Sequence, residues 1–345
     1  MSLRPVYNPP NPWSSTSREW LEEPPLAKLE IFEEEAKSLI SSNDSPDIGF
    51  RHSCNPYRGC SHACAYCYAR PSHQYLGYGA GTDFETKIIV KTNAAKLLRA
   101  EFMRPKWQGE PIVFSGNTDC YQALEASYQL TRDCLKVCAE FQNPVSIITK
   151  GVLIRRDIDV LSELNRKTRL HVSISIAFAD DAVARLMEPG APPPSARFEA
   201  IRALTEAGIP VAVGVAPIIP GLNDGAIAEI LERAHAAGAR WAFRTLLRLP
   251  AELKDVFIHT LEERFPSRAK KILGQLKEER GGKLYDATFG KRMQGQGPLW
   301  ENADGIFKVM VKKLKMNQLD EEAGNYKAIT QAKTFRRPGE QLGLF

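Results

Sequence analysis

A cluster of three cysteines constrains this chain more than any other feature of its sequence. Cys60, Cys64 and Cys67 lie within eight residues, at the spacing Cys-x3-Cys-x2-Cys. Three thiolates this close together can bind three irons of a cubane iron–sulfur cluster. The fourth iron then has no ligand from the motif and is open to a small molecule.

Two other metal sites are compatible with the same cysteines, and each needs a fourth protein ligand. A structural zinc ion usually has four Cys or His ligands, and an electron-transfer cluster usually has four cysteines. Nearby residues can supply the missing ligand: Cys54 for either site, and His52 or His62 for zinc. The residues alone leave these alternatives open.

Length and composition set the broad class of protein. The chain has 345 residues, which suits one barrel-sized domain with extensions, and its seven cysteines are typical of metal chemistry in a reducing compartment. A formal net charge of +5 permits a nucleic-acid partner without requiring one. The first residues lack the apolar core of a signal peptide, and no apolar run is long enough to span a membrane. We therefore expect a soluble, cytoplasmic protein without membrane contact.

Strand and helix patterns alternate from about residue 48. The expected strands are Ile48–Cys54, Ile112–Gly116, Val145–Thr149, Leu170–Ile176, Val211–Ala216 and Trp241–Leu246. The expected helices are Asn93–Met103, Gln122–Phe141, Asp157–Leu164, Asp180–Met187, Ala196–Ala207, Ala226–Ala237 and Ala251–Leu261. The alternation predicts an α/β fold in which parallel strands form a partial (β/α)6 barrel. The cysteine loop follows the first strand, at the end of such barrels where the chemistry lies.

The chain divides into four expected parts. Residues 1–45 form an extended arm with one short helical piece from Pro25 to Ile40, and residues 46–265 form the partial barrel. Residues 266–317 form a C-terminal helical extension, which contains an amphipathic helix over Ala303–Lys315. Residues 318–345 form a polar, flexible tail.

The cysteine motif, with Tyr66 before its last cysteine, resembles the signature of the radical S-adenosylmethionine superfamily. Four longer stretches resemble the branch that contains spore photoproduct lyase and the DNA repair photolyases: Cys54–Arg70, Asp83-Phe-Glu-Thr-Lys87, Ser115-Gly-Asn-Thr-Asp119 and Glu188-Pro-Gly-Ala-Pro192. The resemblance covers about residues 48–250 and implies the same (β/α)6 core that the strand pattern predicts.

The resemblance also implies cofactors and a reaction. Cys60, Cys64 and Cys67 become ligands of a [4Fe–4S] cluster, whose open iron binds S-adenosylmethionine. One electron, from a donor such as flavodoxin or ferredoxin, then cleaves the sulfonium to a 5′-deoxyadenosyl radical. Tyr68, directly after the last cysteine, becomes a candidate cofactor contact.

Small and polar residues at two expected strand ends are further candidate cofactor contacts. Ser115, Gly116 and Asn117 occupy the place of the superfamily motif that binds the methionyl amino group. A plain turn with Asp119 as a helix cap is the alternative. Lys150 can pair with the cofactor carboxylate, although a solvated lysine is the commoner outcome for a single Lys.

The next two strands offer three more candidate cofactor contacts. Ser173 and Ser175 share one face of their strand, which suggests a polar lumen, and buried hydroxyls with protein partners are the alternative. Gly214 lies among small residues that would let adenine approach the backbone, or else it is a packing glycine.

Three arginines are candidates for binding the substrate. Arg244 and Arg248 stand at an even spacing, so we expect them on one face near the barrel mouth, where they can hold a phosphate or carboxylate. Ion pairs at the rim are the alternative. Arg197, in the helix after the Glu-Pro-Gly-Ala-Pro motif, is a candidate through the resemblance.

The cysteines outside the motif are weaker candidates for chemistry. The true lyase carries a hydrogen-donating cysteine directly before the serine of the second strand, where this chain has Phe114, so the resemblance does not extend to that step. Cys120 is a conceivable hydrogen donor. Cys134 and Cys138 are most simply small core residues of one helix.

We therefore expect an enzyme that cleaves S-adenosylmethionine reductively and abstracts hydrogen from a nucleic-acid or nucleotide substrate, as in DNA repair. An iron–sulfur protein that senses redox state on DNA without turnover is an alternative of another class. Radical modification of RNA or of a protein is a second enzymatic alternative.

The last five residues suggest a protein partner. Gln341, Leu342, Leu344 and Phe345 fit the pentapeptide Gln-Leu-x-Leu-Phe by which bacterial polymerases and repair proteins bind the replication sliding clamp. A polar anchor followed by two apolar side chains suits an apolar groove. Packing of the terminal Leu-Phe on the protein's own core is the alternative.

Overall fold

The computed structural model describes residues 4–14, 21–318 and 334–339. Within these ranges the larger sheet has the order β10-β9-β8-β7-β6-β3-β2. The strands from β3 to β10 pair in parallel, and β2 is antiparallel at one edge. The strands are β2 (Ile40–Ser42), β3 (His52–Cys54), β6 (Ile112–Phe114), β7 (Val145–Thr149), β8 (Leu170–Ser175), β9 (Val211–Ile218) and β10 (Trp241–Leu246). The predicted parallel α/β core of six strands is confirmed.

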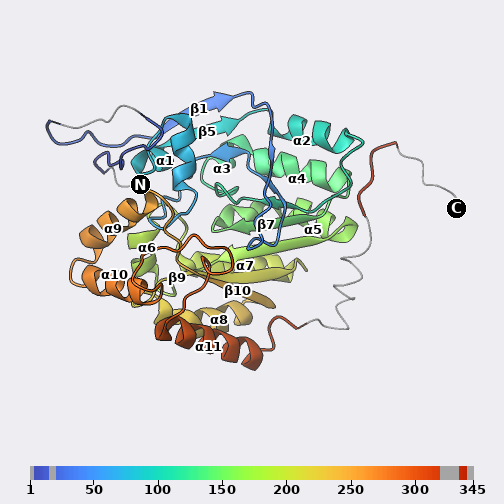
Figure 1. Cartoon of the computed structure of the whole chain (residues 1–345). Helices are drawn as coiled ribbons and strands as arrows, with labels where there is room; N and C mark the ends of the chain where they lie inside the picture. Colours follow the sequence, from blue (N-terminus) through green and yellow to red (C-terminus); the bar gives the residue numbers. More distant parts are fainter. Residues whose placement is uncertain (1–3, 15–20, 319–333, 340–345) are drawn as a thin grey trace.

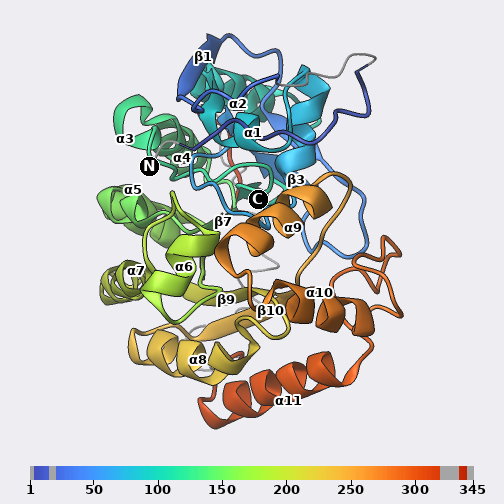
Figure 2. The same ribbon diagram turned by 90° about the vertical axis from the view of Figure 1, so that its left-hand side faces the viewer.

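Helices cover the sheet in the order of the chain (Figure 1). The longer ones are α2 (Ala94–Met103), α4 (Leu130–Glu140), α5 (Ile158–Lys167), α6 (Asp181–Met187), α7 (Pro194–Glu206), α8 (Ile227–Ala236), α9 (Leu253–Arg264), α10 (Ala269–Glu278) and α11 (Pro298–Lys313). Shorter helical turns are η1 (Arg70–Leu76), α1 (Thr82–Thr86), α3 (Glu125–Tyr128), η2 (Val152–Asp157) and η3 (Asp224–Ala226). Figure 2 shows α7 and α8 beside β9 and β10, and both helices contact β9.

The main core fills the space between this sheet and its helices. The strands are apolar on their buried positions, as parallel strands covered by helices usually are. Cys134 and Cys138 belong to this core, as predicted. In the described part of the chain, no helix is both long and apolar enough to cross a membrane.

The arm before the core contains strands, so the helical piece predicted from Pro25 to Ile40 is wrong. Glu30–Glu34 forms β1, which pairs in parallel with β5 (Lys87–Lys91), and β4 (Tyr57–Arg58) pairs with the other edge of β5. Glu30 lies opposite Lys87 and Glu34 opposite Lys91. Opposite charges across a strand pair favour the sheet, and this tertiary pairing overrides the helix propensity of the glutamates.

Part of the predicted flexible tail packs on the core. Phe335 lies against the rings of Phe102 and Phe141, at centroid distances of 5.8 and 6.1 Å. A Cβ atom on Gly109 would lie only 2.3 Å from Cβ of Phe335, so a glycine is needed there. Arg337 donates hydrogen bonds to the carbonyl oxygens of three residues on the same surface: Phe102, Arg104 and Trp107. The residues Gln341 to Phe345 of the predicted clamp motif lie outside the described residues.

Candidate functional site

A cavity of about 410 Å³ lies at the carboxyl ends of the parallel strands. Its size falls in the range of small-molecule sites. The residues that line it come from the carboxyl ends of β7, β8, β9 and β10 and from the loops after β3, β6, β7 and β10, and include Cys60, Ser115, Lys150, Ser175, Pro217 and Arg248. The cysteine loop and the other strand ends therefore face one space.

All three cysteines of the motif line this cavity. Burial raises the pKa of Cys60 well above its ordinary value, and repulsion from Asp119 and the neighbouring thiols adds to it. Burial also raises the pKa of Cys64 to about 12, although Lys150 partly offsets the rise. A nearby cationic group favours ionisation of buried thiols of this kind, and iron would supply that charge when bound.

The chemistry of the donor set suits an iron–sulfur cluster. Three thiols from one loop line one cavity, and each can bind a different iron of a cubane. The residues present therefore fit a [4Fe–4S] cluster with one iron free of protein ligands. Among the described residues, no group of three His, Cys, Asp or Glu side chains is placed to hold a single metal ion.

The residues considered as a fourth ligand have other partners. Cys54 is buried in the core, and its hydrogen bond with the thiol of Cys134, together with burial, raises the pKa of Cys134. His52 lies against Trp107, with ring centroids 5.1 Å apart. His62 does line the cavity, but its Nδ1 lies 3.3 Å from the carboxylate of Asp119.

Side chains from the β6–α3 loop hold the start of the cysteine loop. Thr118 Oγ1 donates to the carbonyl oxygen of Gly59 at 2.5 Å, and Gln122 Nε2 donates to the same oxygen at 3.3 Å. The backbone N–H of Ser61 donates to Gln122 Oε1 at 2.9 Å. Gly59 has a φ of +76°, and a Cβ there would lie 2.9 Å from the carbonyl oxygen of Phe84, so only glycine fits well.

A buried arginine holds the end of the cysteine loop. Arg70 Nε donates to the carbonyl oxygen of Cys64 at 2.9 Å, and its Nη1 donates to the carbonyl oxygen of Gly81 at 2.8 Å. Its Nη2 pairs with Glu85, which also pairs with Arg4 of the N-terminal arm. Glu85 is the glutamate of the Asp-Phe-Glu-Thr-Lys stretch, so this stretch and the arm both support the loop.

A second buried ion pair joins the loop to the Glu-Pro-Gly-Ala-Pro stretch. Glu188 accepts hydrogen bonds from Tyr66 and Arg197, and all three side chains are buried. Arg197 Nη1 also donates to the carbonyl oxygen of Ser175 at 3.1 Å. Because Arg197 is fully buried in these contacts, the structure argues against the predicted substrate contact and gives it a structural role.

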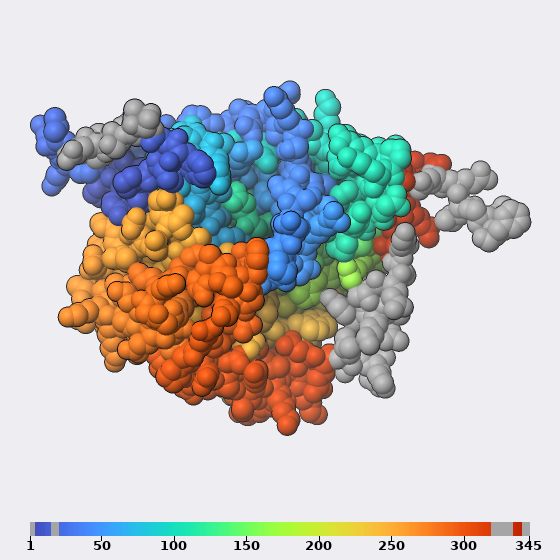
Figure 3. Space-filling view, viewed as in Figure 1, coloured from blue at the N-terminus to red at the C-terminus, as the bar shows by residue number. Residues whose placement is uncertain are grey.

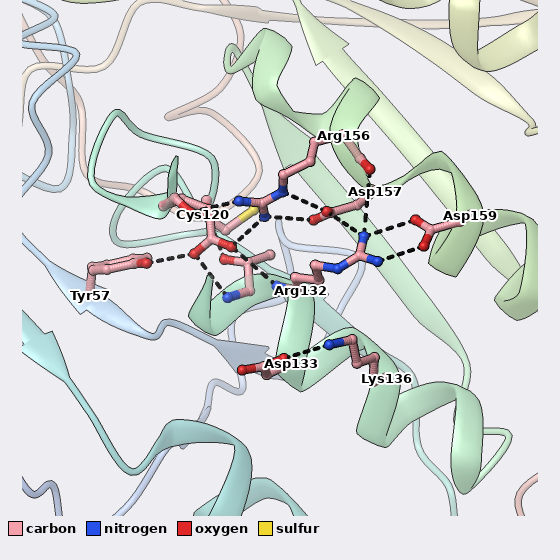
Figure 4. A network of polar contacts seen from close by, with 10 residues as sticks. Tyr57, Cys120, Arg132, Asp133, Lys136, Arg156, Asp157 and Asp159 are labelled. Carbon is pink, nitrogen blue, oxygen red and sulfur yellow. Dashed lines mark hydrogen bonds and ion pairs between the residues drawn. The ribbon is translucent and has the colours of Figure 1, made fainter. Parts of the chain in front are cut away.

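Sequence reasoning did not find the polar network behind the cysteine loop (Figure 4). Glu125 is fully buried and accepts hydrogen bonds from the hydroxyl of Tyr57 at 2.5 Å and from Arg156 Nη2 at 2.8 Å. Arg156 and Arg132 both pair with the buried Asp157. Burial, followed by the charge of Glu125, raises the pKa of Tyr57 well above its ordinary value. Through Tyr57, which lies three residues before Cys60, the network fixes the position of β4. No periodic pattern in the sequence predicts these contacts.

The residues after β6 line the cavity as predicted, but Asp119 does not cap a helix. Its carboxylate accepts hydrogen bonds from Thr149 Oγ1 at 2.5 Å and from the N–H of Lys150 at 2.8 Å, so it joins the ends of β6 and β7. Burial alone would raise the pKa of Asp119. The charge of His62, its hydrogen bond, and those from Lys150 and Thr149 outweigh burial and lower that pKa far below its ordinary value.

The predicted cofactor contacts separate into two groups. Tyr68, Ser115, Gly116, Asn117, Lys150 and Ser175 line the cavity. Ser173 and Gly214 do not line it. A Cβ on Gly214 would lie 2.6 Å from the ring of Phe243, so Gly214 makes room for Phe243, and this ring faces the cavity in its place. Cys120, the conceivable hydrogen donor, is fully buried and does not line the cavity either.

Arg244 and Arg248 do not share a face, contrary to prediction. The register between β9 and β10 shifts between Arg244 and Leu246, so the alternation of side chains is broken there. Arg244 pairs with Asp304 of α11 and lies 4.7 Å from the ring centre of Phe307. Arg248 lines the cavity, with its guanidinium 5.5 Å from the ring centre of Tyr68.

Known proteins resemble this chain in sequence. The model of the Radical SAM superfamily matches residues 54–234, just over half of the chain. An uncharacterised protein of Mycobacterium tuberculosis (strain H37Rv) is 43% identical over 194 residues, which cover 56% of this chain and 57% of that protein. This chain thus spans little more than half the length of that relative. An uncharacterised protein of Methanocaldococcus jannaschii is 29% identical over 240 residues, which cover 70% of this chain and 85% of that protein.

One solved structure has a similar fold. Spore photoproduct lyase with bound S-adenosylmethionine and dinucleoside spore photoproduct superposes with a TM-score of 0.58 at 15% identity. The match covers 82% of this chain and 78% of the lyase chain. At this identity the similarity is one of fold.

Proposed function

The chain belongs to the Radical SAM superfamily, and from that premise we propose that it is an enzyme that cleaves S-adenosylmethionine reductively and abstracts hydrogen from a nucleic-acid or nucleotide substrate. One observation carries the proposal: the three motif cysteines and the polar strand-end residues line a single cavity. A cluster and a small cofactor can therefore occupy adjacent positions in it.

The residues of the chain take distinct roles in this proposal. Cys60, Cys64 and Cys67 would hold the [4Fe–4S] cluster. When bound, the cluster and S-adenosylmethionine supply the 5′-deoxyadenosyl radical. Lys150 has no acidic partner among the described residues, and its Nζ lies 5.5 Å from the ring centre of Tyr66. Its ammonium is therefore free to pair with the cofactor carboxylate.

Two more residues complete the cofactor pocket in the proposal. Ser175 and Asn117 would donate hydrogen bonds to polar groups of S-adenosylmethionine, since both line the cavity. Phe243 and Pro217 line the same cavity and would exclude water from the reacting atoms.

The fold similarity to spore photoproduct lyase supports a nucleic-acid substrate, because that structure contains a dinucleoside spore photoproduct. This chain has Phe114 at the end of β6, fully buried, directly before Ser115. We therefore propose lesion or nucleotide chemistry that does not use a cysteine at that position. A flavodoxin or ferredoxin would deliver the electron.

The decisive experiment tests turnover without knowledge of the substrate. The protein is reconstituted anaerobically with iron and sulfide, reduced with dithionite and incubated with S-adenosylmethionine, and 5′-deoxyadenosine is quantified. We expect product from the wild type and none from the Cys60→Ala, Cys64→Ala or Cys67→Ala variants. An intact cluster without any product would refute the enzyme and favour the redox-sensing alternative.

A second experiment addresses the substrate. Nucleosides from a strain lacking the gene and from its parent are compared by untargeted mass spectrometry, on both DNA and RNA. A modified deoxynucleoside that accumulates only in the deletion strain supports the DNA substrate. A change confined to RNA nucleosides points to the RNA alternative, and identical profiles in both point to a protein substrate.

We also infer a protein partner for the C-terminus. The peptide Gln341–Phe345 would bind the groove of a bacterial sliding clamp, with Leu344 and Phe345 as apolar anchors. The packed segment Thr334–Gly339 supports this idea, because it would tether the peptide to the surface of α2 and α4. A clamp partner would place the enzyme on DNA.

A further inference from the structure

We propose that Arg248, which lines the cavity, forms a phosphate-binding site that takes a phosphodiester group of the nucleic-acid substrate, with Arg280 buried beside it as a positioning residue that adds positive charge. The inference rests on the proposed function and adds to it the residues that recognise the substrate backbone. It replaces Arg244 of the sequence prediction with an arginine from the C-terminal extension.

Arg248 is the arginine that faces the cavity. Among the described residues it forms no ion pair, and its Nε is buried without a hydrogen-bond partner. Its described contact is with the ring of Tyr68, which also lines the cavity and is half exposed. A guanidinium stacked in this way keeps its donors available in the plane of the fork.

Arg280, in the loop after α10, is brought next to Arg248. Its Nη2 donates to the carbonyl oxygen of Leu247 at 2.5 Å and to that of Arg292 at 3.3 Å. Arg280 is only 6% exposed, and its Nε and Nη1 are buried without a hydrogen-bond partner. The bond to Leu247, the neighbour of Arg248 in the chain, ties the two arginines to the same turn.

The positive charge of Arg280 is only partly offset by its surroundings. Burial lowers the pKa of Arg280. The charges of Tyr285 and Asp286 partly offset this decrease, whereas repulsion from Arg248 lowers the pKa further. Neither guanidinium has an acidic partner among the described residues. Because Arg248 lines the cavity, a phosphate there can accept from its guanidinium in the bidentate geometry that such groups favour. The buried charge of Arg280 adds to the attraction without touching the phosphate.

The segment around Arg280 is rich in basic residues, which favours binding of a polyanion. Residues 264–293 contain nine Lys and Arg against three Asp and Glu, whereas the whole chain has a net charge of only +5. The orange surface of α10 and the loop that follows forms one continuous face in Figure 3. A basic face of this kind attracts the phosphates of nucleic acids through counterion release.

The inner end of this segment meets the cavity. Phe289 is 58% exposed, and the guanidinium of Arg292 lies 4.7 Å from its ring centre. Arg292 pairs with Asp47, and both Asp47 and the neighbouring Met293 line the cavity. An exposed ring beside a basic track is a stacking surface for a base. A strand bound along the segment would thus place a phosphate at the arginine pair and a base near Phe289.

The test measures binding of a fluorescein-labelled single-stranded oligothymidylate by anisotropy. The proteins are the wild type, Arg248→Ala, Arg280→Met and the control Arg202→Ala, whose side chain is 49% exposed on α7. In Arg248→Ala, loss of hydrogen bonds to a charged group should weaken binding about 10- to 150-fold and lower the salt-dependence slope by about one. Arg280→Met should weaken binding by a smaller factor, because it removes a nearby charge and no phosphate contact, and the control should match the wild type.

Two further arms identify the anion. Replacing the oligonucleotide by its neutral methylphosphonate analogue should remove the difference between wild type and variants. Arg248→Lys, which retains the charge and most of the packing, should recover part of the affinity. Wild-type oligonucleotide affinity in both Arg248→Ala and Arg280→Met would overturn the proposal.

Calorimetry with S-adenosylmethionine tests whether the arginines bind the cofactor carboxylate instead of a phosphate. A loss of affinity confined to S-adenosylmethionine would show that the pair binds the cofactor carboxylate, and the phosphate site would be wrong. If the wild type forms 5′-deoxyadenosine but does not bind the oligonucleotide, the phosphate site fails while the radical chemistry stands.

Discussion

The two sides of the cavity are built in opposite ways. On the cysteine side, the buried guanidiniums of Arg70 and Arg197 each pair with a buried carboxylate, Glu85 and Glu188. On the side that Arg248 lines, the guanidinium of the adjacent Arg280 is also buried, yet it has no acidic partner among the described residues, and two of its nitrogens lack any acceptor.

The paired arginines fix the position of the cysteine loop, whereas the unpaired arginines are suited to binding a ligand. A buried ion pair adds little net stability, but its removal is costly, and its directed hydrogen bonds hold a loop in one geometry. The cysteine loop needs such fixed geometry, because three thiolates must meet three irons. The arginine side instead presents Arg248 to the cavity without an acidic partner among the described residues, so its guanidinium can bind an incoming anion.

The largest expected effect is loss of the cluster from the cysteine side. Alanine at Cys60, Cys64 or Cys67 should each abolish the cluster, since three thiolates are its whole protein ligand set in the proposal. Iron and sulfide content and the visible absorption of the anaerobically reconstituted protein measure this. Cys54→Ala is the matched control and should retain nearly all the iron, because Cys54 lies in the core beside Cys134. Loss of iron in that control would indicate a four-cysteine centre.

The second prediction compares the same substitution on both sides. Arg197→Met leaves the buried carboxylate of Glu188 without its partner and should lower the free energy of unfolding by about 3–5 kcal/mol. Arg280→Met leaves no carboxylate unpaired, because Arg280 pairs with none, and should cost less than half as much. Urea unfolding of the two variants, followed by circular dichroism, gives both values. Equal losses would remove the contrast between the two sides.

The third prediction concerns the cofactor residues between the two sides. Lys150→Ala and Ser175→Ala each remove a hydrogen bond to a charged group, on the order of 1.5–3 kcal/mol, so S-adenosylmethionine should bind about 10- to 150-fold more weakly. Ser173→Ala is the control from the same strand and should bind like the wild type, since Ser173 does not line the cavity. Calorimetric titration of the reconstituted proteins measures all three. Normal affinity in both Lys150→Ala and Ser175→Ala would contradict the pocket described here.

The smallest effect on the cavity is expected from the C-terminal peptide. Deletion of Gln341–Phe345 should abolish retention by an immobilised bacterial sliding clamp and leave 5′-deoxyadenosine formation at the wild-type level. The deletion should not affect the cavity because Phe335, the residue that anchors this part of the chain, packs on Phe102 and Phe141, and none of these residues lines the cavity. Clamp binding that survives the deletion, or none by the full-length protein, would exclude this partner.

Local patterns in the sequence determined the core and most of the cofactor side. Cys-x3-Cys-x2-Cys places three thiols on one loop whatever surrounds it, and alternating strands and helices predict parallel pairing. Since the carboxyl ends of parallel strands lie at one edge, Ser115, Lys150 and Ser175 had to come close together. These inferences need only spacing and periodicity.

Contacts between distant parts of the chain decided the rest. A shift in register within β10 turned Arg244 toward α11, and a hydrogen bond to Leu247 brought Arg280 beside Arg248 from 33 residues away. Pairing with β5 made Glu30–Glu34 a strand. In each case the energy comes from a partner that is remote in the sequence, so no local pattern encodes it. The cysteine side of the cavity can therefore be predicted from the sequence, whereas the arginine side depends on long-range contacts that only the tertiary structure shows.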